Sequence, residues 1–274
     1  MTGYQYWERF IAQWHNGKLE TLKGEWSNPD DIPLYGNEND NVLTSEYIPE
    51  PWWGNDGSLP LYSVVINFNP GQGGESQLRS KIPYYSSYAI DIVNRIVSNN
   101  DIDLWPEGKN GGTRGWHKTR RAMPLLNTLA ELGFISAPYG LENHLSVELI
   151  PWHTKGVEKK YKEYLKKNIS AVYKYSICFA AERAKDIENE KLRSIVFLRM
   201  SGGNTRYLMK LMNDNNIVTI DDSEASFLIG NGKCMEFHIA NLPSTRFISI
   251  WGRYSRNNFP CSEELKKIIQ KVIG

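Results

Sequence analysis

Four short segments of the chain are largely apolar, rich in β-branched or aromatic residues, and followed by turn-forming residues. They are Leu61–Phe68, Leu145–Ile150, Ser194–Leu198 and Phe247–Trp251. Short apolar runs of this kind are typical of strands that are buried on both faces of a parallel sheet. We therefore expect these four segments to form the central sheet.

Helical patterns separate these strands. The segments concerned are about Tyr4–Leu22, about Tyr85–Asn99, about Thr119–Leu132, about Val157–Ile187, the residues after Ser201-Gly202-Gly203-Asn204 to about Asn213, and a last helix with Ser262 as its N-cap. Residues 217–240 instead predict short strands or a hairpin around Gly230-Asn231-Gly232. Strands that alternate with helices predict an α/β fold. We expect a three-layer α/β/α sandwich with a central, mostly parallel, four-stranded sheet.

The N-terminal part has a different composition. Residues 23–60 are rich in Asn, Asp, Gly and Pro and end in Pro49-Glu50-Pro51-Trp52-Trp53-Gly54, which predicts a long irregular connection. Connections of this length usually wrap a domain or line a site. We expect residues 1–60 to form an N-terminal helix and wrapping loop, and residues 61–274 to form the α/β domain of a single compact unit.

Composition narrows the classes of function. Of the 274 residues, 41% are hydrophobic and 23% are charged, as in ordinary globular proteins. The net charge of +1 gives no overall field that requires a nucleic-acid partner, although a local basic patch is allowed. The three cysteines stand far apart, which argues against a disulfide framework and a zinc site. With no apolar leader or membrane-length run, we expect a soluble, cytoplasmic monomer without metal or cofactor.

The loops after the strands are the candidate sites, because ligands of parallel sheets bind outside the carboxyl ends of the strands. These loops are residues 67–74, 148–156, 199–204 and 253–258. The first continues as Asn69-Pro70-Gly71-Gln72-Gly73-Gly74, which matches neither G-x-G-x-x-G nor the P-loop. Because the dinucleotide pattern is missing, a Rossmann-type cofactor enzyme is a minor alternative. The chain also lacks the G-x-S-x-G and H-E-x-x-H motifs of two hydrolase classes.

The segment Val65-Ile66-Asn67-Phe68-Asn69-Pro70-Gly71 resembles the first motif of the mismatch-specific and single-strand-selective branches of the uracil-DNA glycosylase superfamily. In that family this loop holds the water that attacks the sugar. Glu148-Leu149-Ile150-Pro151 resembles the end of the second family strand, where an Asn that reads the base often precedes a Pro by three positions. The resemblance covers about residues 50–274, by the order of the elements.

Two further segments fit the same order. Phe197-Leu198-Arg199-Met200-Ser201-Gly202-Gly203 resembles the third strand and its Gly turn, and Ser255-Arg256-Asn257-Asn258 stands where the family carries its second catalytic and DNA-wedge loop. The usual His-Pro-Ser or Asn-Pro-Ser is absent from that last loop, and Leu242-Pro243-Ser244 is a rival placement. The resemblance implies a DNA glycosylase-like fold and the hydrolysis of the N-glycosidic bond of a flipped, damaged or mismatched base.

The implied chemistry assigns roles to the first loop. Asn69 would orient the attacking water, and Pro70 and Gly71 would let the backbone approach the nucleotide closely. Tyr84 or Tyr85 would stack on the base. The further substrate-binding candidates are Asn67, Phe68, His153, Ser255 and Asn257. The alternatives are a tight strand-to-helix turn with two core tyrosines, and a histidine satisfied within its loop.

Glu148 is the most informative single position. A carboxylate only accepts hydrogen bonds, so it opposes a uracil carbonyl and suits a base with two adjacent donors or an exocyclic amine. It could instead act as general base for the water. The structural alternative is a carboxylate turned toward Lys155 or toward a backbone N–H.

Five basic residues predict that the partner is nucleic acid. Those expected to contact nucleic acid, DNA rather than RNA, are Arg114, Lys118, Arg121, Arg253 and Arg256. A solvated helix start is the other interpretation of the stretch from Trp105 to Arg121. The main alternative function is a non-catalytic protein that binds nucleic acid or a nucleotide on the same fold.

Overall fold

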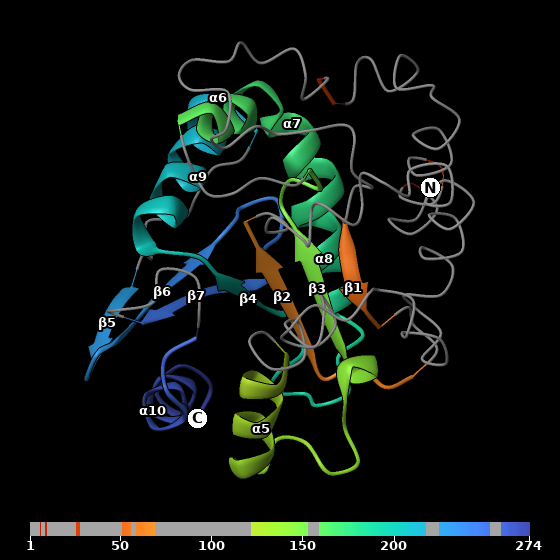
Figure 1. Cartoon of the computed structure of the whole chain (residues 1–274), viewed down its shortest axis with the longest axis vertical. Helices are drawn as coiled ribbons and strands as arrows, with labels where there is room; N and C mark the ends of the chain where they lie inside the picture. Colours follow the sequence, from red (N-terminus) through yellow and green to blue (C-terminus); the bar gives the residue numbers. More distant parts are fainter. Residues whose placement is uncertain are drawn as a thin grey trace, which may run out of the picture.

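The computed structural model describes residues 51–55, 59–68, 122–152, 159–217, 225–252 and 259–274, together with Tyr6, Arg9, Trp26 and Ser27. Within these residues, one seven-stranded sheet has the strand order β1-β3-β2-β4-β7-β6-β5 (Figure 1). Its strands are β1 (Trp52–Gly54), β2 (Ser63–Asn67), β3 (His144–Glu148), β4 (Ile195–Arg199), β5 (Ala225–Ile229), β6 (Gly232–His238) and β7 (Arg246–Gly252).

The centre of the sheet is parallel. The strands β3, β2, β4 and β7 run in one direction, and they are the four segments that the apolar pattern predicts, so the α/β prediction is confirmed. The expected count of four strands is wrong. The edge strand β1 pairs antiparallel with β3, although its residues were expected to be irregular. At the other edge the predicted hairpin, β5 and β6, adds two antiparallel strands beside β7.

The helix expected over about Tyr85–Asn99, and the one over about Tyr4–Leu22 apart from Tyr6 and Arg9, lie outside the described residues. The other expected helices are present with different ends, and one of them is interrupted. The described helices are α5 (Met123–Glu131), the 3-10 helix η5 (Leu141–Asn143), α6 (Lys159–Lys167), α7 (Ile169–Ala171), the π-helix η6 (Val172–Ile177), α8 (Cys178–Ala184), α9 (Gly202–Asp214) and α10 (Ser262–Ile273). The expected N-cap, Ser262, is the first residue of α10, because Cys261 occupies the N-cap position with an extended backbone.

The long helix expected over Val157–Ile187 is interrupted at Asn168. This residue has non-helical dihedral angles, φ −111° and ψ 17°. Its side-chain amide donates to the Tyr164 carbonyl at 2.8 Å and accepts from the Ser27 backbone N–H at 2.6 Å. The break therefore coincides with a contact to a residue 141 positions away, which helical periodicity cannot reveal.

Helices cover both faces of the sheet. Arg246 and Ser249 lie three positions apart on β7, so their side chains point to opposite faces. Arg246 Nη2 donates to the Val272 carbonyl of α10 at 2.5 Å, whereas Ser249 Oγ lies 2.7 Å from Thr205 Oγ1 of α9. Figure 1 shows α5 and α10 together at the bottom of the view, α6, α7 and α9 in its upper part, and α8 at mid-height beside β3. No helix in the described part of the chain combines the length and the apolar composition needed to cross a bilayer.

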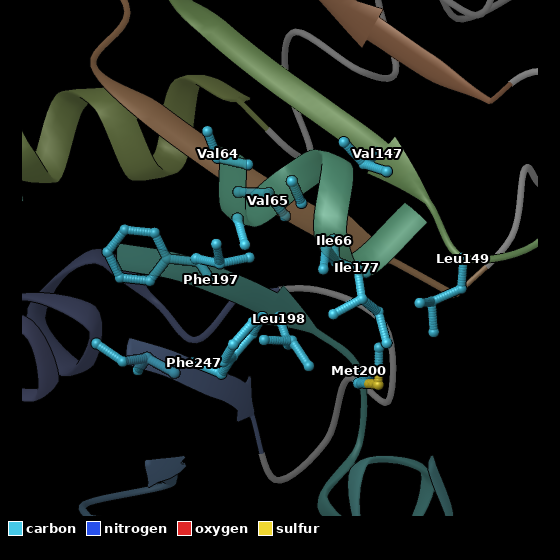
Figure 2. Packing of buried hydrophobic residues seen from close by; sticks show 14 of the residues in the cluster. Val64, Val65, Ile66, Val147, Leu149, Ile177, Phe197, Leu198, Met200 and Phe247 are labelled. Atoms are coloured by element: carbon cyan, nitrogen blue, oxygen red, sulfur yellow. The ribbon is translucent and has the colours of Figure 1, made fainter. Parts of the chain in front are cut away.

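The two faces of the central strands differ in polarity. On one face, Ile66, Val147 and Leu198 are buried near Ile177 of the π-helix (Figure 2). The opposite face of β2 and β3 carries polar residues that are equally buried: Ser63, Asn67, His144, Ser146 and Glu148. Because parallel strands are normally apolar on both faces, this polar face marks the place to look for a site.

Candidate functional site

Three polar residues stand side by side at the carboxyl ends of the central strands. In the sheet register, Asn67 is paired with Glu148 of β3 on one side and with Arg199 of β4 on the other. Paired residues of neighbouring parallel strands project from the same face. Glu148, Asn67 and Arg199 are exposed by only 0%, 1% and 5%, so a carboxylate, an amide and a guanidinium form one buried row. We call these three residues the polar row.

The Asn67 amide is oriented by its neighbour strand. Its Nδ2 donates to Ser146 Oγ at 2.5 Å and lies 3.3 Å from Glu148 Oε1. The amide oxygen, Oδ1, therefore faces away from these two groups, and among the described residues it has no hydrogen-bond partner. A buried acceptor without a partner is rare in folded proteins and costs roughly 1–3 kcal/mol. This oxygen is the strongest structural indication of a ligand site.

The order of the strands places this row where a ligand would bind. From β2 the chain passes to β3 on one side, and later to β4 on the other side of β2. The order of the sheet thus reverses between β2 and β4, and such a switch point opens a crevice outside the carboxyl ends of the strands. Asn67 and Arg199 are the last residues of the two strands that flank it.

Helix α6 fixes the end of β2. The Tyr161 hydroxyl donates to the carbonyl of Phe68, and the two rings pack with their centroids 4.8 Å apart. Burial raises the pKa of Tyr161 well above its usual value of 10.0, and the negative charge of Glu148 raises it further. The contact with Tyr161 therefore fixes the backbone of Phe68, the residue that directly precedes Asn69 in the sequence.

The same helix fixes the end of β3. The hydroxyl of Tyr164 accepts a hydrogen bond from Trp152 Nε1 at 2.6 Å and donates to the carbonyl of Ser27. Trp152 lies four residues beyond Glu148, is 1% exposed, and follows the strand end that carries the carboxylate. Two tyrosines one turn apart on α6 therefore position both strand ends beside the polar row.

Three predicted site residues lie within the described structure. Asn67 and Glu148 are brought into contact, and Phe68 packs against Tyr161. His153, and Lys155 as an alternative partner of Glu148, lie outside the described residues. The other candidates outside them are Asn69, Pro70, Gly71, Tyr84, Tyr85, Ser255, Asn257, Arg114, Lys118, Arg121, Arg253 and Arg256.

Sequence reasoning gave no individual role to Ser146, Arg199 or Tyr161, although Arg199 begins the candidate loop 199–204. For Ser146 a signal exists, because it lies two positions before Glu148 on a strand and so shares its face. The charge of Arg199 within an apolar strand is also visible in the sequence. Tyr161 has no such signal, because its helix reads as a charged surface helix and only the packed structure shows which turn meets β2.

The arrangement offers hydrogen bonding and charge at one buried place. The carboxylate can accept further bonds or take a proton, the amide oxygen can accept, and the guanidinium can donate. Among the described residues, no group of three His, Cys, Asp or Glu side chains is placed to hold a metal ion. No protein-family model, curated protein or solved structure matches the chain.

Proposed function

We propose that this chain hydrolyses the N-glycosidic bond of a base that is flipped out of nucleic acid, DNA rather than RNA. One observation carries the proposal. The buried carboxylate of Glu148 contacts the Asn67 amide at the carboxyl ends of adjacent parallel strands, two residues before Asn69-Pro70-Gly71. The similarity of both segments to the glycosylase superfamily supports the same activity.

The residues fit the needs of this reaction. Glycosidic cleavage passes through an oxocarbenium-like state, so it needs a positioned water and a negative charge near the sugar. Asn69 would orient the water, whose proton passes to solvent as the oxygen bonds to C1′ and the base departs with the bonding electrons. The negative charge of Glu148 would stabilise the oxocarbenium-like state. Burial strengthens the field of the carboxylate, because little solvent screens it.

The test uses the purified full chain and labelled oligonucleotides that carry uracil, hypoxanthine, xanthine or a mismatch. Abasic product is revealed by alkaline cleavage. We expect product on at least one substrate. Asn69→Ala removes the group that positions the water and Glu148→Gln removes the buried charge, so each should lower the rate about 100-fold or more. Glu190→Gln, an exposed carboxylate just before β4, is the matched control and should keep full activity.

Two results would decide against the enzyme. Failure to produce abasic sites on every substrate, together with tight binding of single strands, would favour the non-catalytic binding protein. Glu148 favours that alternative, because it stands where the glycosylases carry an amide. A large loss of thermal stability in Asn69→Ala, rather than of activity alone, would show that the loop is a structural turn.

A further inference from the structure

We propose that the polar row reads a base edge with two adjacent donors followed by a carbonyl, the edge that guanine presents. This inference rests on the proposed function in one respect, that the ligand of the site is a nucleobase. It adds the class of base, which neither catalysis nor fold specifies.

The Asn67 amide is fixed as an acceptor toward the site. Its Nδ2 points to Ser146 Oγ and Glu148 Oε1, both on β3. Rotation of the amide by 180° would place its oxygen against the Glu148 carboxylate, where two acceptors repel each other. The observed orientation is therefore favoured, and it leaves Oδ1 buried and without a partner among the described residues.

The row then has a defined order of hydrogen-bonding groups. Glu148 accepts, and its carboxylate has further lone pairs beyond the one that meets Asn67. Asn67 Oδ1 accepts next to it. Arg199 donates, and its guanidinium carries five N–H groups, so it can contribute one beside any bond that it already makes. Neighbouring strands lie about 4.8 Å apart, which lets three adjacent side chains address one planar ring.

Guanine is the base whose edge complements this order. It presents the 2-amino group and the ring N1–H as adjacent donors, followed by the O6 carbonyl. Hypoxanthine has the same ring but lacks the amino group. Uracil presents a carbonyl on each side of its single N–H, so one carbonyl would face a buried acceptor. Leaving buried polar groups unpaired is how such sites reject close analogues.

The test compares guanine with hypoxanthine, because the two differ only by the amino group. Each base, and uracil as a third, is placed at one position of the same oligonucleotide opposite an abasic analogue, so that no base pair must be broken. The dissociation constant and the rate of abasic-site formation are measured for each. We expect guanine to be bound about 10-fold or more tightly than hypoxanthine, as a bond to a charged acceptor gives.

Variants assign the preference to the row. Glu148→Gln replaces an acceptor by an amide that can also donate. It should abolish the difference in affinity between guanine and hypoxanthine, here called the affinity gap, and improve uracil binding, because the amide can donate to a uracil carbonyl. Ser146→Ala releases the Asn67 amide while both acceptors remain, and should narrow the affinity gap without reversing it. Glu190→Gln should keep the affinity gap of the unmodified protein. Circular dichroism shows which variants are folded, and the wild-type comparison needs none of them.

The outcomes separate this inference from the proposed function. A difference of less than about twofold between the dissociation constants for guanine and hypoxanthine, or a preference for hypoxanthine or uracil, overturns the inference, even if the protein produces abasic sites. A guanine preference in binding without any cleavage upholds the inference and overturns the proposed hydrolysis. The absence of binding and cleavage on all three oligonucleotides overturns both.

Discussion

At the residue scale, the buried amide of Asn67 lowers the stability of the fold. It ends a strand whose other buried residues, such as Val64 and Ile66, contribute packing. An apolar residue of similar size would avoid the cost of a buried oxygen that finds no partner among the described residues, which is roughly 1–3 kcal/mol. Natural proteins keep such local costs mainly at functional positions. This is why we give the amide, rather than its apolar neighbours, a role in binding.

Two adjacent glycines at the start of α9 allow a matched prediction. A Cβ at Gly202 would overlap the Trp251 ring of β7, whereas a Cβ at Gly203 would meet nothing within 4 Å. We expect Gly202→Ala to destabilise the protein by about 1–3 kcal/mol, because the indole must move. Gly203→Ala should be neutral or up to about 1 kcal/mol more stable, because alanine favours a helix. Urea unfolding measures both changes, and equal effects would show that α9 does not pack closely on Trp251.

At the scale of elements, α6 and the π-helix connect the strand ends to one another. Tyr161 and Tyr164 of α6 bond to Phe68 and Trp152, and Ser176 of the π-helix donates to the Leu149 carbonyl at 3.1 Å. The residues contacted, Phe68, Leu149 and Trp152, lie one to four positions after Asn67 or Glu148 in the sequence. π-Helical turns are rare and frequently occur beside functional sites. The helix α6 and the π-helix therefore set the positions of the two strand ends.

The buried hydroxyl of Tyr161 on α6 predicts a loss of stability at high pH. Burial and Glu148 raise the pKa of Tyr161, so the folded protein keeps this proton at a pH where an unfolded chain, with a pKa near 10.0, loses it. The stabilisation is complete below pH 10 and falls above it, by about 1.4 kcal/mol per pH unit for one proton. Urea unfolding between pH 9 and pH 11 should show a steeper fall in the wild type than in Tyr161→Phe. Equal slopes would mean that Tyr161 ionises freely in the folded state.

At the scale of the whole molecule, α10 joins the antiparallel strands β5 and β6 to α5. Its residues Leu265 and Ile268 are fully buried, and Arg246 of β7 joins Glu236 of β6 at 2.7 Å and the Val272 carbonyl of α10. Lys266 reaches Glu131 of α5 at 2.5 Å. This face of the sheet is therefore held by apolar burial, with ion pairs at its edge.

The third stability prediction compares the apolar burial of α10 with the ion pairs at its edge. We expect Ile268→Ala to cost about 2–5 kcal/mol, because it removes fully buried methyl groups and leaves a cavity. Lys266→Ala should cost much less than Ile268→Ala, because its ion pairs with Glu131 and Glu263 are exposed to solvent. Thermal and urea unfolding in low and high salt measure both. A larger effect of Lys266→Ala would contradict the view that burial holds α10.

The sequence was most informative where structure depends on neighbours in the chain. Leu61–Phe68, Leu145–Ile150, Ser194–Leu198 and Phe247–Trp251 each contain a described strand or most of one, and the hairpin around Gly230-Asn231-Gly232 is present. Apolar runs and turn residues are local signals. The three-residue strand β1 was missed, because a short edge strand in a segment rich in Pro and Gly has no period to detect.

For the site too, some features follow from the sequence and others only from the tertiary structure. The sequence alone placed Asn67, Glu148 and Arg199 at the starts of the loops expected after three apolar segments, because residue type and order are properties of the chain. Only the tertiary structure decided that Asn67 meets Ser146, 79 positions away, with its oxygen turned from Glu148. The order of the strands in the sheet, which brings Glu148, Asn67 and Arg199 into one row, depends on how the crossover connections fold back. No local pattern encodes that choice, because it results from burying all the strands and helices together.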